Sequence, residues 1–221
     1  MTPTTLNRTR RVVGTALAAA TLAAALSACA PLIVGGAVVG GVMAVDRRTA
    51  GTQIEDEGIE LRAANRIRET LGDRAHVNVT SYNRQALLTG EVATAQDRQA
   101  VEQMVSQVEN VRSVVNDLAV MPPSTLSQRS TDTFITGKVR ASLVDAQDIS
   151  ANSFKVVTER NTVYLMGRVS QREATRATDI ARGVTDVRKV VRVFEIVSEE
   201  ELRRIAPQPA PVTTDTKPAG G

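Results

Sequence analysis

Residues 77–92 read VNVTSYNRQALLTGEV, and residues 154–169 read FKVVTERNTVYLMGRV. In both stretches, apolar residues alternate with polar ones on either side of a polar turn, and this pattern predicts a β-hairpin. Gly90 in the first stretch corresponds to Gly167 in the second. The chain therefore contains an internal repeat, which constrains its architecture more than any single motif does.

Helical patterns flank both hairpins in the same order. Apolar residues recur every four positions before each hairpin, as expected for the buried stripe of a helix. These residues are Ala63, Ile67 and Leu71 in the first copy, and Ile135, Val139 and Leu143 in the second. After each hairpin a capping-box pattern begins a second helix, at Thr94 with Asp97 and at Ser170 with Glu173.

A valine-rich segment closes each copy, as expected for a strand rich in β-branched residues. Each copy therefore reads helix, strand, strand, helix, strand. This order predicts an α+β fold with two domains, residues 46–121 and 129–198, each a three-stranded sheet packed by two helices. Gly90 and Gly167 match no phosphate-binding loop, and they indicate a bulge or a close approach of two backbones.

The remaining segments are short or poor in large apolar residues. Residues 122–128 contain Pro122 and Pro123, which favour an extended and semi-stiff linker. Residues 199–221 begin with three glutamates that are able to continue a short helix, but the segment as a whole is predicted to be disordered.

The N-terminal segment has the composition of a secretory signal peptide. Three arginines precede an apolar run, and residues 1–28 end in small residues before Cys29, the only cysteine. The sequence LSAC at 26–29 resembles a bacterial lipobox, which implies that Cys29 is acylated. Ala30 follows instead of an inner-membrane retention Asp, so the resemblance implies an outer-membrane location facing the periplasm. Residues 31–45 form an apolar, glycine-rich tether that is too short to span a bilayer, and whether it lies in the membrane is left open.

The net basic charge of the chain resides in the signal segment. The chain has 27 basic and 24 acidic residues, and three arginines precede Cys29. Residues 46–121 carry nine basic and twelve acidic residues, whereas residues 129–198 carry twelve and eight. The mature protein therefore has no overall basic field for nucleic acid, but its second domain is suited to an anionic surface.

The side chains needed for common catalytic sites are scarce. His76 is the only histidine, and Cys29 is assigned to the lipid anchor, so no Cys–His pair, histidine-dependent triad or His/Cys metal cluster can form. His76 opens a predicted strand, where a surface or capping role is expected. We therefore predict neither an enzyme nor a bound cofactor or metal.

The repeat, its strand-ending glycines and its valine-rich closing strands resemble the tandem BON-domain lipoproteins. The segment DTFITGKVRASL at 132–143 and VYLMGRV at 163–169 carry the resemblance most specifically. It implies a non-enzymatic protein without a cofactor that binds phospholipid and helps to preserve the envelope. A close member of the family often has Trp where this chain has Phe134.

Phe134 lies outside the buried stripe of its helix and aligns with Arg62 of the first copy. We expect Phe134 to insert among acyl chains while Lys138 and Arg140 meet anionic head groups. The alternative is that Phe134 covers the edge of the core or the interface with the first domain.

Two functions follow from these features. The first is binding of an anionic phospholipid membrane through the second domain. The alternative is a lipid-tethered scaffold for an outer-membrane assembly or for a cell-division or peptidoglycan-remodelling protein. Clustered cations around an inserted apolar group favour the first, and a larger apolar patch with a polar rim favours the second.

Acylation of Cys29 gives the first testable prediction. The Cys29→Ala variant should lose metabolic palmitate labelling and should leave the membrane fraction, because two or more acyl chains are what hold a lipoprotein stably. Labelling and fractionation that match the unaltered protein would rule out this anchor.

Overall fold

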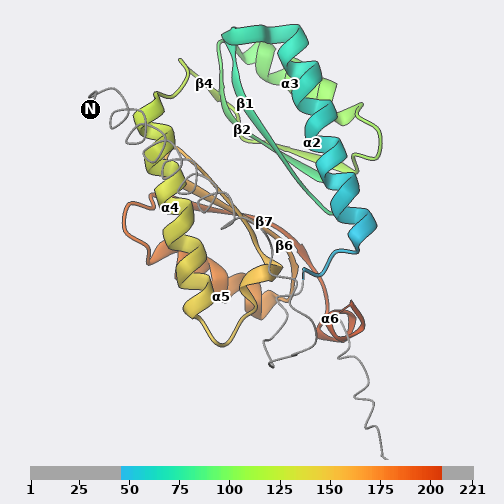
Figure 1. Ribbon diagram of the computed structural model, residues 1–221, viewed down its shortest axis with the longest axis vertical. Coiled ribbons are helices and arrows are strands. Elements are labelled where there is room, and N and C mark those ends of the chain that lie inside the picture. Colours follow the sequence, from blue (N-terminus) through green and yellow to red (C-terminus); the bar gives the residue numbers. More distant parts are fainter. Residues whose placement is uncertain (1–45, 206–221) are drawn as a thin grey trace, which may run out of the picture. The chain divides into compact units, whose positions relative to one another are not determined.

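The computed structural model describes residues 46–205 of the chain. The first copy contains α2 (Ala50–Leu71), β1 (His76–Tyr82), β2 (Gln85–Val92), α3 (Ala95–Ser106), β3 (Ser113–Asn116) and β4 (Ala119–Val120). The second contains α4 (Leu126–Asp145), β5 (Lys155–Glu159), β6 (Thr162–Val169), α5 (Gln171–Arg182) and β7 (Lys189–Ile196), and α6 (Glu199–Ile205) follows (Figure 1). The predicted order of helices and strands is confirmed in both copies.

Each sheet combines an antiparallel hairpin with a parallel third strand. The pairs β1–β2 and β5–β6 are antiparallel, and the strands after α3 and α5 return parallel to β2 and β6. The first sheet differs from the prediction because its closing strand is split into β3 and β4, and both pair with β2. At this break Leu118 joins the core of the first copy, and Asp117 accepts a hydrogen bond from the Tyr164 hydroxyl at 2.7 Å.

The hairpin turns use left-handed backbone at both central residues. Asn83 and Arg84 have φ values of 51° and 65°, and Arg160 and Asn161 have 49° and 61°. Positive φ at both positions is the mark of a type I′ turn, whose twist matches that of the strands.

A buried aspartate near the start of the first helix holds each of these turns. Asp56 of α2 accepts hydrogen bonds from the amides of Asn83 and Arg84 at 2.8 and 2.7 Å. In the second copy, Asp132 of α4 accepts from the two equivalent turn amides at 2.8 and 2.9 Å. The two carboxylates are 1% and 5% exposed. We call each set of contacts the aspartate clamp of its copy.

The aspartate clamps correct the alignment of the two helices. Asp56 is equivalent to Asp132, and the N-cap residue Thr49 is equivalent to Thr125. The counterpart of Phe134 is therefore Gly58, not Arg62 as the sequence repeat indicates. The sequence alignment was wrong by one turn, because apolar residues spaced every four positions still match after a shift of four.

Arg62 is instead the counterpart of Lys138, and both side chains donate to equivalent backbone carbonyls. Arg62 Nη2 donates to the Glu109 carbonyl at 3.2 Å, and Lys138 Nζ donates to the Thr185 carbonyl at 3.1 Å. Both carbonyls belong to the loop after the second helix of their copy, just before a residue with positive φ.

The two corresponding glycines of the repeat, Gly90 and Gly167, permit close backbone contacts, as predicted. A Cβ at Gly90 would lie 2.1 Å from the His76 carbonyl oxygen, and Gly90 has a φ of 110°. A Cβ at Gly167 would lie 2.4 Å from the Ser153 carbonyl oxygen. Any side chain at either position would therefore push the neighbouring segment away from the sheet.

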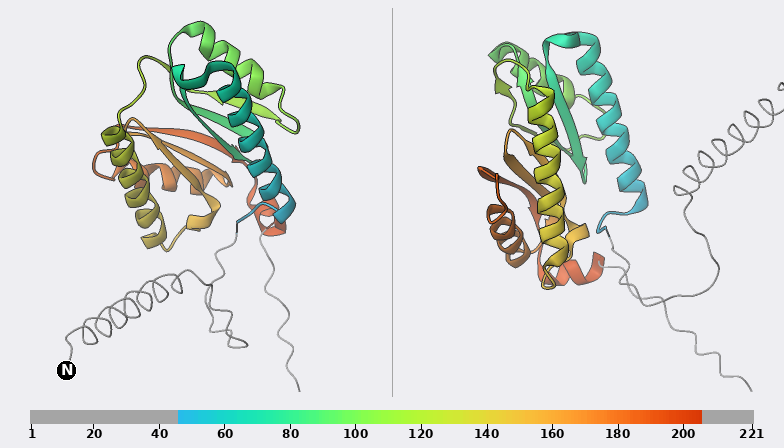
Figure 2. Two further views of the ribbon diagram at one scale, coloured as in Figure 1. Left: turned by 45° about the horizontal axis from the view of Figure 1, so that its top comes forward. Right: turned by 60° about the vertical axis from the view of Figure 1, so that its left-hand side comes forward.

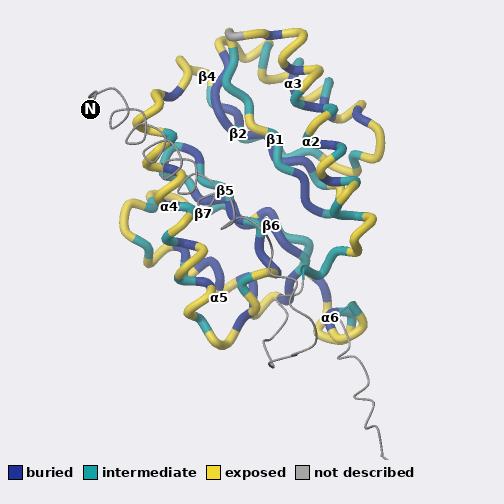
Figure 3. Tube along the Cα trace, in the orientation of Figure 1, coloured by how far each residue is buried: buried dark blue, intermediate teal, exposed yellow. Residues whose placement is uncertain are grey.

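The helices of each copy cover one face of its sheet, and the opposite faces of the two sheets meet (Figures 1, 2 and 3). The predicted helix stripes are buried in two separate cores. A third apolar cluster joins the copies and consists of Tyr82, Leu87, Tyr164, Met166 and Val193. The copies therefore share an apolar interface in addition to their own cores.

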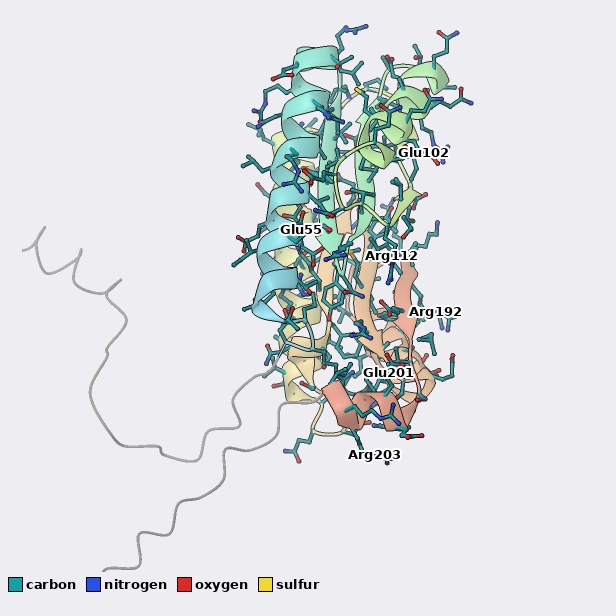
Figure 4. The ribbon with its side chains drawn as sticks, turned by 90° about the vertical axis from the view of Figure 1, so that its right-hand side faces the viewer. Glu55, Glu102, Arg112, Arg192, Glu201 and Arg203 are labelled. Atoms are coloured by element: carbon teal, nitrogen blue, oxygen red, sulfur yellow. The ribbon has the colours of Figure 1, made fainter. Side chains whose placement is uncertain are left out.

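Polar contacts surround this apolar interface. Lys155 Nζ of the second copy donates to Glu60 Oε1 at 2.6 Å. Arg112, which lies beside β3 and is labelled in Figure 4, donates to Glu195 Oε2 of β7 at 3.1 Å. Burial raises the pKa of the Tyr164 phenol, and its hydrogen bond to Asp117 raises that pKa further.

Two predicted boundaries need correction. The linker assigned to 122–128 is shorter, because α4 begins at Leu126 with a capping box between Thr125 and Gln128. Residues 199–205 of the predicted disordered tail form α6, in which Leu202 is 7% exposed and Glu201 pairs with Arg168 at 2.8 Å. Acidic residues in its first turn favour the helix through its dipole. The rest of that tail lies outside the described residues.

The predicted capping boxes differ between the copies. Ser170 and Glu173 form the full reciprocal box at the start of α5. At the start of α3, Thr94 accepts from the Asp97 amide, and the shorter Asp97 side chain accepts from the Thr94 hydroxyl at 2.7 Å. The first copy therefore has the N-cap without the reciprocal bond to its backbone.

The contrast between Gly90, where a side chain would clash, and Gly137, where it would meet open space, gives a prediction. Gly90→Ala should lower the free energy of unfolding by more than about 2 kcal/mol, because it combines positive φ with a backbone clash. Gly137→Ala is the control, since a Cβ there meets nothing within 4 Å. That helical substitution should stabilise the protein by about 0.5–1 kcal/mol. Urea unfolding measures both, and equal effects would contradict the close approach.

The first aspartate clamp gives a pH prediction. Burial alone raises the pKa of Asp56, but hydrogen bonds from Ser81, the Arg84 amide and Arg48 outweigh it, so the pKa lies below its ordinary value. The ionised carboxylate thus stabilises the fold above about pH 4, and this contribution is lost as the pH falls through the folded-state pKa. Asp56→Asn should cost about 3 kcal/mol at pH 7, and the difference from the unaltered protein should shrink below pH 4.

Urea unfolding at a series of pH values measures this difference. Asp145→Asn is the control, because Asp145 is exposed at the end of α4. A difference between Asp56→Asn and the unaltered protein that stays constant down to pH 2–3 would contradict the clamp's ionic character.

Candidate functional site

The outward face of α4 carries an exposed apolar ridge. Ile135, Val139 and Leu143 are buried, as predicted, and they commit one side of the helix to the core. Three large apolar residues lie on the other side: Leu126, Phe134 and Val144, which are 80%, 67% and 68% exposed. We call these three residues the α4 ridge.

The exposure of Phe134 excludes one of its two sequence-based interpretations. A ring that is 67% exposed covers neither the edge of the core nor the interface with the first copy, so that alternative is wrong. The inward side of α4 is sealed by its own apolar stripe and by Asp132. Phe134 is therefore available to an external partner.

Lys138 lies beside Phe134 and is already paired. Its Nζ is 4.9 Å from the centre of the Phe134 ring, within the range of a cation–π contact. The same Nζ donates to Asp186 Oδ2 at 2.9 Å. The prediction that these two residues adjoin is confirmed, but Lys138 must share its charge with Asp186.

Arg140 lies on the other flank of the α4 ridge. At about 100° per residue, Arg140 is about 40° around the axis from Val144, and Lys138 is about 40° from Phe134 in the opposite sense. Arg140 is exposed and makes no salt bridge within the part of the chain that the structure describes. The two predicted cations therefore flank the apolar residues instead of forming one cluster.

Sequence reasoning missed two members of the α4 ridge. Leu126 falls in the predicted linker 122–128, and no predicted pattern includes Val144. The two residues are 18 positions apart, which is about five helical turns, so they share one face of α4. The available signal was this spacing together with their position out of phase with the buried stripe.

The other two phenylalanines belong to the core. The rings of Phe154 and Phe194 meet edge to face with centroids 6.0 Å apart, and Phe154 is 8% exposed. Their presence in the second copy therefore does not contribute to an exposed aromatic surface. Only Phe134 does so among the three.

His76 does not occupy the surface position expected for it. Its side chain is 19% exposed, and its Nδ1 lies 2.9 Å from Glu91 Oε2. Glu91 is opposite His76 in the β1–β2 register, and Glu159 of the second copy lies close to both. The structure thus brings one histidine and two carboxylates together, a combination not predicted from the sequence.

Several predicted features lie outside the described residues. These are the signal peptide 1–28, the acylated Cys29 and the tether 31–45. Within the described part of the chain, no helix is both long enough and apolar enough to cross a membrane.

Comparison with known proteins identifies the two copies. The model of the BON domain matches residues 56–122 and 131–198. The chain belongs to the BON-domain family. The two matches begin near the aspartates of the two clamps, so the BON domain includes the helix, hairpin and closing strand described above.

Two similar proteins extend the likeness beyond the BON domains. Outer membrane lipoprotein DolP of Haemophilus influenzae is 34% identical over 172 residues, covering 77% of this chain and 89% of the relative. The 21 kDa hemolysin of Actinobacillus pleuropneumoniae is 32% identical over 155 residues, covering 69% and 80%. The chain is accordingly an outer-membrane lipoprotein with two BON domains.

A solved structure with a distant likeness is that of CdsD, a structural protein of the type III secretion system of Chlamydia trachomatis. It is 14% identical, covers 69% of this chain and 96% of its own, and superposes with a TM-score of 0.28.

Proposed function

We propose that this lipoprotein binds anionic phospholipid surfaces through the α4 ridge of its second BON domain, and that this contact supports the integrity of the envelope. The observation that carries the proposal is the exposed ridge of Leu126, Phe134 and Val144 with a cation on each flank. An amphipathic surface of this kind suits the boundary between head groups and acyl chains.

The expected contributions are of similar size. Transfer of a phenyl ring from water into an apolar environment contributes about 1.5–3 kcal/mol, and each cation near an anionic leaflet adds about 1 kcal/mol. Arg140 offers its full charge, whereas Lys138 is partly neutralised by Asp186. The ring and Arg140 should therefore dominate, with Lys138 contributing less.

The first BON domain lacks an equivalent ridge. The counterpart of Phe134 is Gly58, and the Arg62 guanidinium lies so close that a Cβ on Gly58 would be 2.8 Å from Arg62 Nη1. The first domain also has an excess of acidic residues, twelve against nine basic ones in residues 46–121. These differences support a lipid contact by the second domain.

The chain enters the folded region beside the second domain. Arg47, which precedes α2, forms a two-pronged salt bridge to Glu173 of α5 at 2.7 and 2.8 Å. Arg47 also donates to the Arg168 carbonyl at 2.9 Å. The first residues that the structure describes therefore lie against the domain proposed to contact the leaflet.

A protein contact on the first domain is the second candidate function. Ile54 and Leu61 of α2 are 70% and 64% exposed, and their spacing of seven residues places them on one face. This pair lies in the acidic domain, where attraction to an anionic leaflet is weak. Ile54 and Leu61 therefore favour the scaffold interpretation, and they also supply a matched control.

Liposome flotation with the chain lacking signal and lipid, residues 30–221, tests the α4 ridge. Phe134→Ala should weaken binding to vesicles containing anionic phospholipid by about tenfold or more, since 1.4 kcal/mol corresponds to tenfold. Its unfolding midpoint should be unchanged, because Phe134 is exposed. Leu61→Ala removes an equally exposed apolar residue from α2 and should bind as the unaltered chain does.

Charge reversal separates the two cations. Arg140→Glu should weaken binding in a salt-dependent way, and neutral vesicles should not show the effect. Lys138→Glu also places two acids side by side at Asp186, so Arg140→Glu is the cleaner test. Normal binding by Phe134→Ala, or a loss shared with Leu61→Ala, would overturn the assignment to α4.

A further inference from the structure

The interface between the BON domains contains a cluster of metal-ligating side chains. His76 and Glu91 come from β1 and β2 of the first domain, and Glu159 comes from β5 of the second. One potential ligand atom from each residue lies within 4.8 Å of the other two. The cluster is separate from the α4 ridge and plays no part in the proposed lipid contact.

The hydrogen bonds of Glu91 leave one carboxylate oxygen without a partner. Glu91 is fully buried, and its Oε2 accepts from the Ser124 amide at 3.0 Å and lies 2.9 Å from His76 Nδ1. Its Oε1 is buried and accepts no hydrogen bond from any residue in 46–205. The Arg160 guanidinium faces Oε1, but its Nε lies 3.7 Å away, which is beyond hydrogen-bond reach.

Glu159 adds a second carboxylate that is poorly compensated. It is 7% exposed, and its Oε2 accepts one hydrogen bond, from Asn78 at 2.9 Å. Two buried carboxylates at this separation repel each other, and a divalent cation would relieve that repulsion for both at once.

The cluster is not a requirement of the BON fold. In the hairpin register of the two copies, Glu91 is equivalent to Arg168, and Glu159 is equivalent to Tyr82. His76 is equivalent to Ser153, whose carbonyl makes the same close approach to a glycine. The three side chains meet only because the two domains pack together, so folding of a single domain does not explain them.

We propose that His76, Glu91 and Glu159 form a zinc-type divalent-metal site that joins the two BON domains. An imidazole nitrogen with two carboxylate oxygens suits Zn²⁺ and similar transition metals, whereas Mg²⁺ and Ca²⁺ prefer all-oxygen sites. A cleft of about 370 Å³ lined by His76, Asp132 and Glu159 gives the site access to solvent. A water molecule from this cleft would complete the coordination.

The metal would replace the direct contact between His76 and Glu91. Ligand bonds to zinc are about 2.0–2.2 Å long, so the three ligand atoms must draw closer together by small side-chain rotations. Glu91 Oε1 is the oxygen with a free coordination position, while Ser124 holds Oε2. Arg160 must move slightly outward, which its 32% exposed side chain allows.

Titration of the metal-stripped lipoprotein in detergent with ZnCl₂ tests the site. We expect saturable binding of one zinc ion per chain by calorimetry. Because the chain has a single histidine, its imidazole NMR signals report on His76 directly, and they should shift with the same saturation. The unfolding midpoint should rise with zinc concentration.

Glu159→Gln and His76→Gln should each weaken zinc binding at least 10- to 100-fold. Loss of a residue that only hydrogen-bonds to a metal ligand already weakens metal binding by that factor, and these two residues are proposed to bind the metal directly. Glu57→Gln is the matched control, because Glu57 is exposed on α2. Far-UV circular dichroism shows whether each variant is folded. If Glu159→Gln does not fold, the zinc affinity of His76→Gln tests the site instead. In the absence of zinc, these variants should bind anionic vesicles normally, which separates this site from the lipid contact.

Absence of saturable binding, or imidazole signals that do not move with zinc, would overturn the proposal. Binding that persists in Glu159→Gln at the affinity of the control would also overturn it, since zinc would then be held without the second domain. Binding by Mg²⁺ in preference to zinc would contradict the assigned metal class.

Discussion

A buried aspartate near the start of the first helix holds that helix on the turn of its own hairpin in each BON domain. The turn amides at residues with positive φ have no strand partner, and a carboxylate accepts both of them. This contact fixes how the helix is rotated about its axis. In α4 the rotation buries the stripe that begins at Asp132 and leaves Phe134 facing outward. The proposed membrane surface depends on it.

The same scaffold serves two different domains because the residues outside the aspartate clamp have diverged. Equivalent positions carry Gly58 and Phe134, and the equivalent cations Arg62 and Lys138 bond to equivalent loop carbonyls. Divergence at the domain interface brought His76 and Glu91 of one copy against Glu159 of the other. The two copies therefore share one backbone fold, but the α4 ridge occurs only in the second copy. The cluster of His76, Glu91 and Glu159 occurs once, between the two copies.

Much of the fold could be predicted from the sequence, because alternation, caps and glycines act locally. The helix stripes, the hairpins and the close approach at Gly90 depend on residues near one another in the chain or in the sheet. The alignment of α2 with α4, the first helices of the two copies, could not be obtained in this way. A stripe of apolar residues spaced every four positions matches equally well after a shift of one turn. In the sequence alone, Asp56 and Asp132 resemble surface residues, because their contacts with the turn amides depend on the tertiary structure.

The candidate site was predictable in part for the same reason. Phe134 and Lys138 could be placed together because both lie on one helix, whereas Leu126 was hidden by the adjacent proline-containing linker. Phe154 and Phe194 could not be assigned to the core from the sequence, because their edge-to-face contact joins the segment before β5 to β7, and β6 lies between these two strands in the sheet. The cluster of His76, Glu91 and Glu159 requires the docking of two domains, which local patterns do not encode.

Immersion depth along α4 tests the central claim most directly. Single cysteines in place of Leu126, Phe134 and Val144, and of Ile54 and Leu61 on α2, would carry nitroxide labels in the lipoprotein reconstituted on anionic vesicles. The acylation proposed for Cys29 would block that residue from labelling. Collision rates with oxygen and with a water-soluble nickel chelate report the depth of each label. The three α4 labels should lie at the boundary of the acyl chains, about 5–10 Å deep, and the α2 labels should remain in water. Fully aqueous labels along α4, or deeper labels on α2, would contradict membrane binding by the second BON domain.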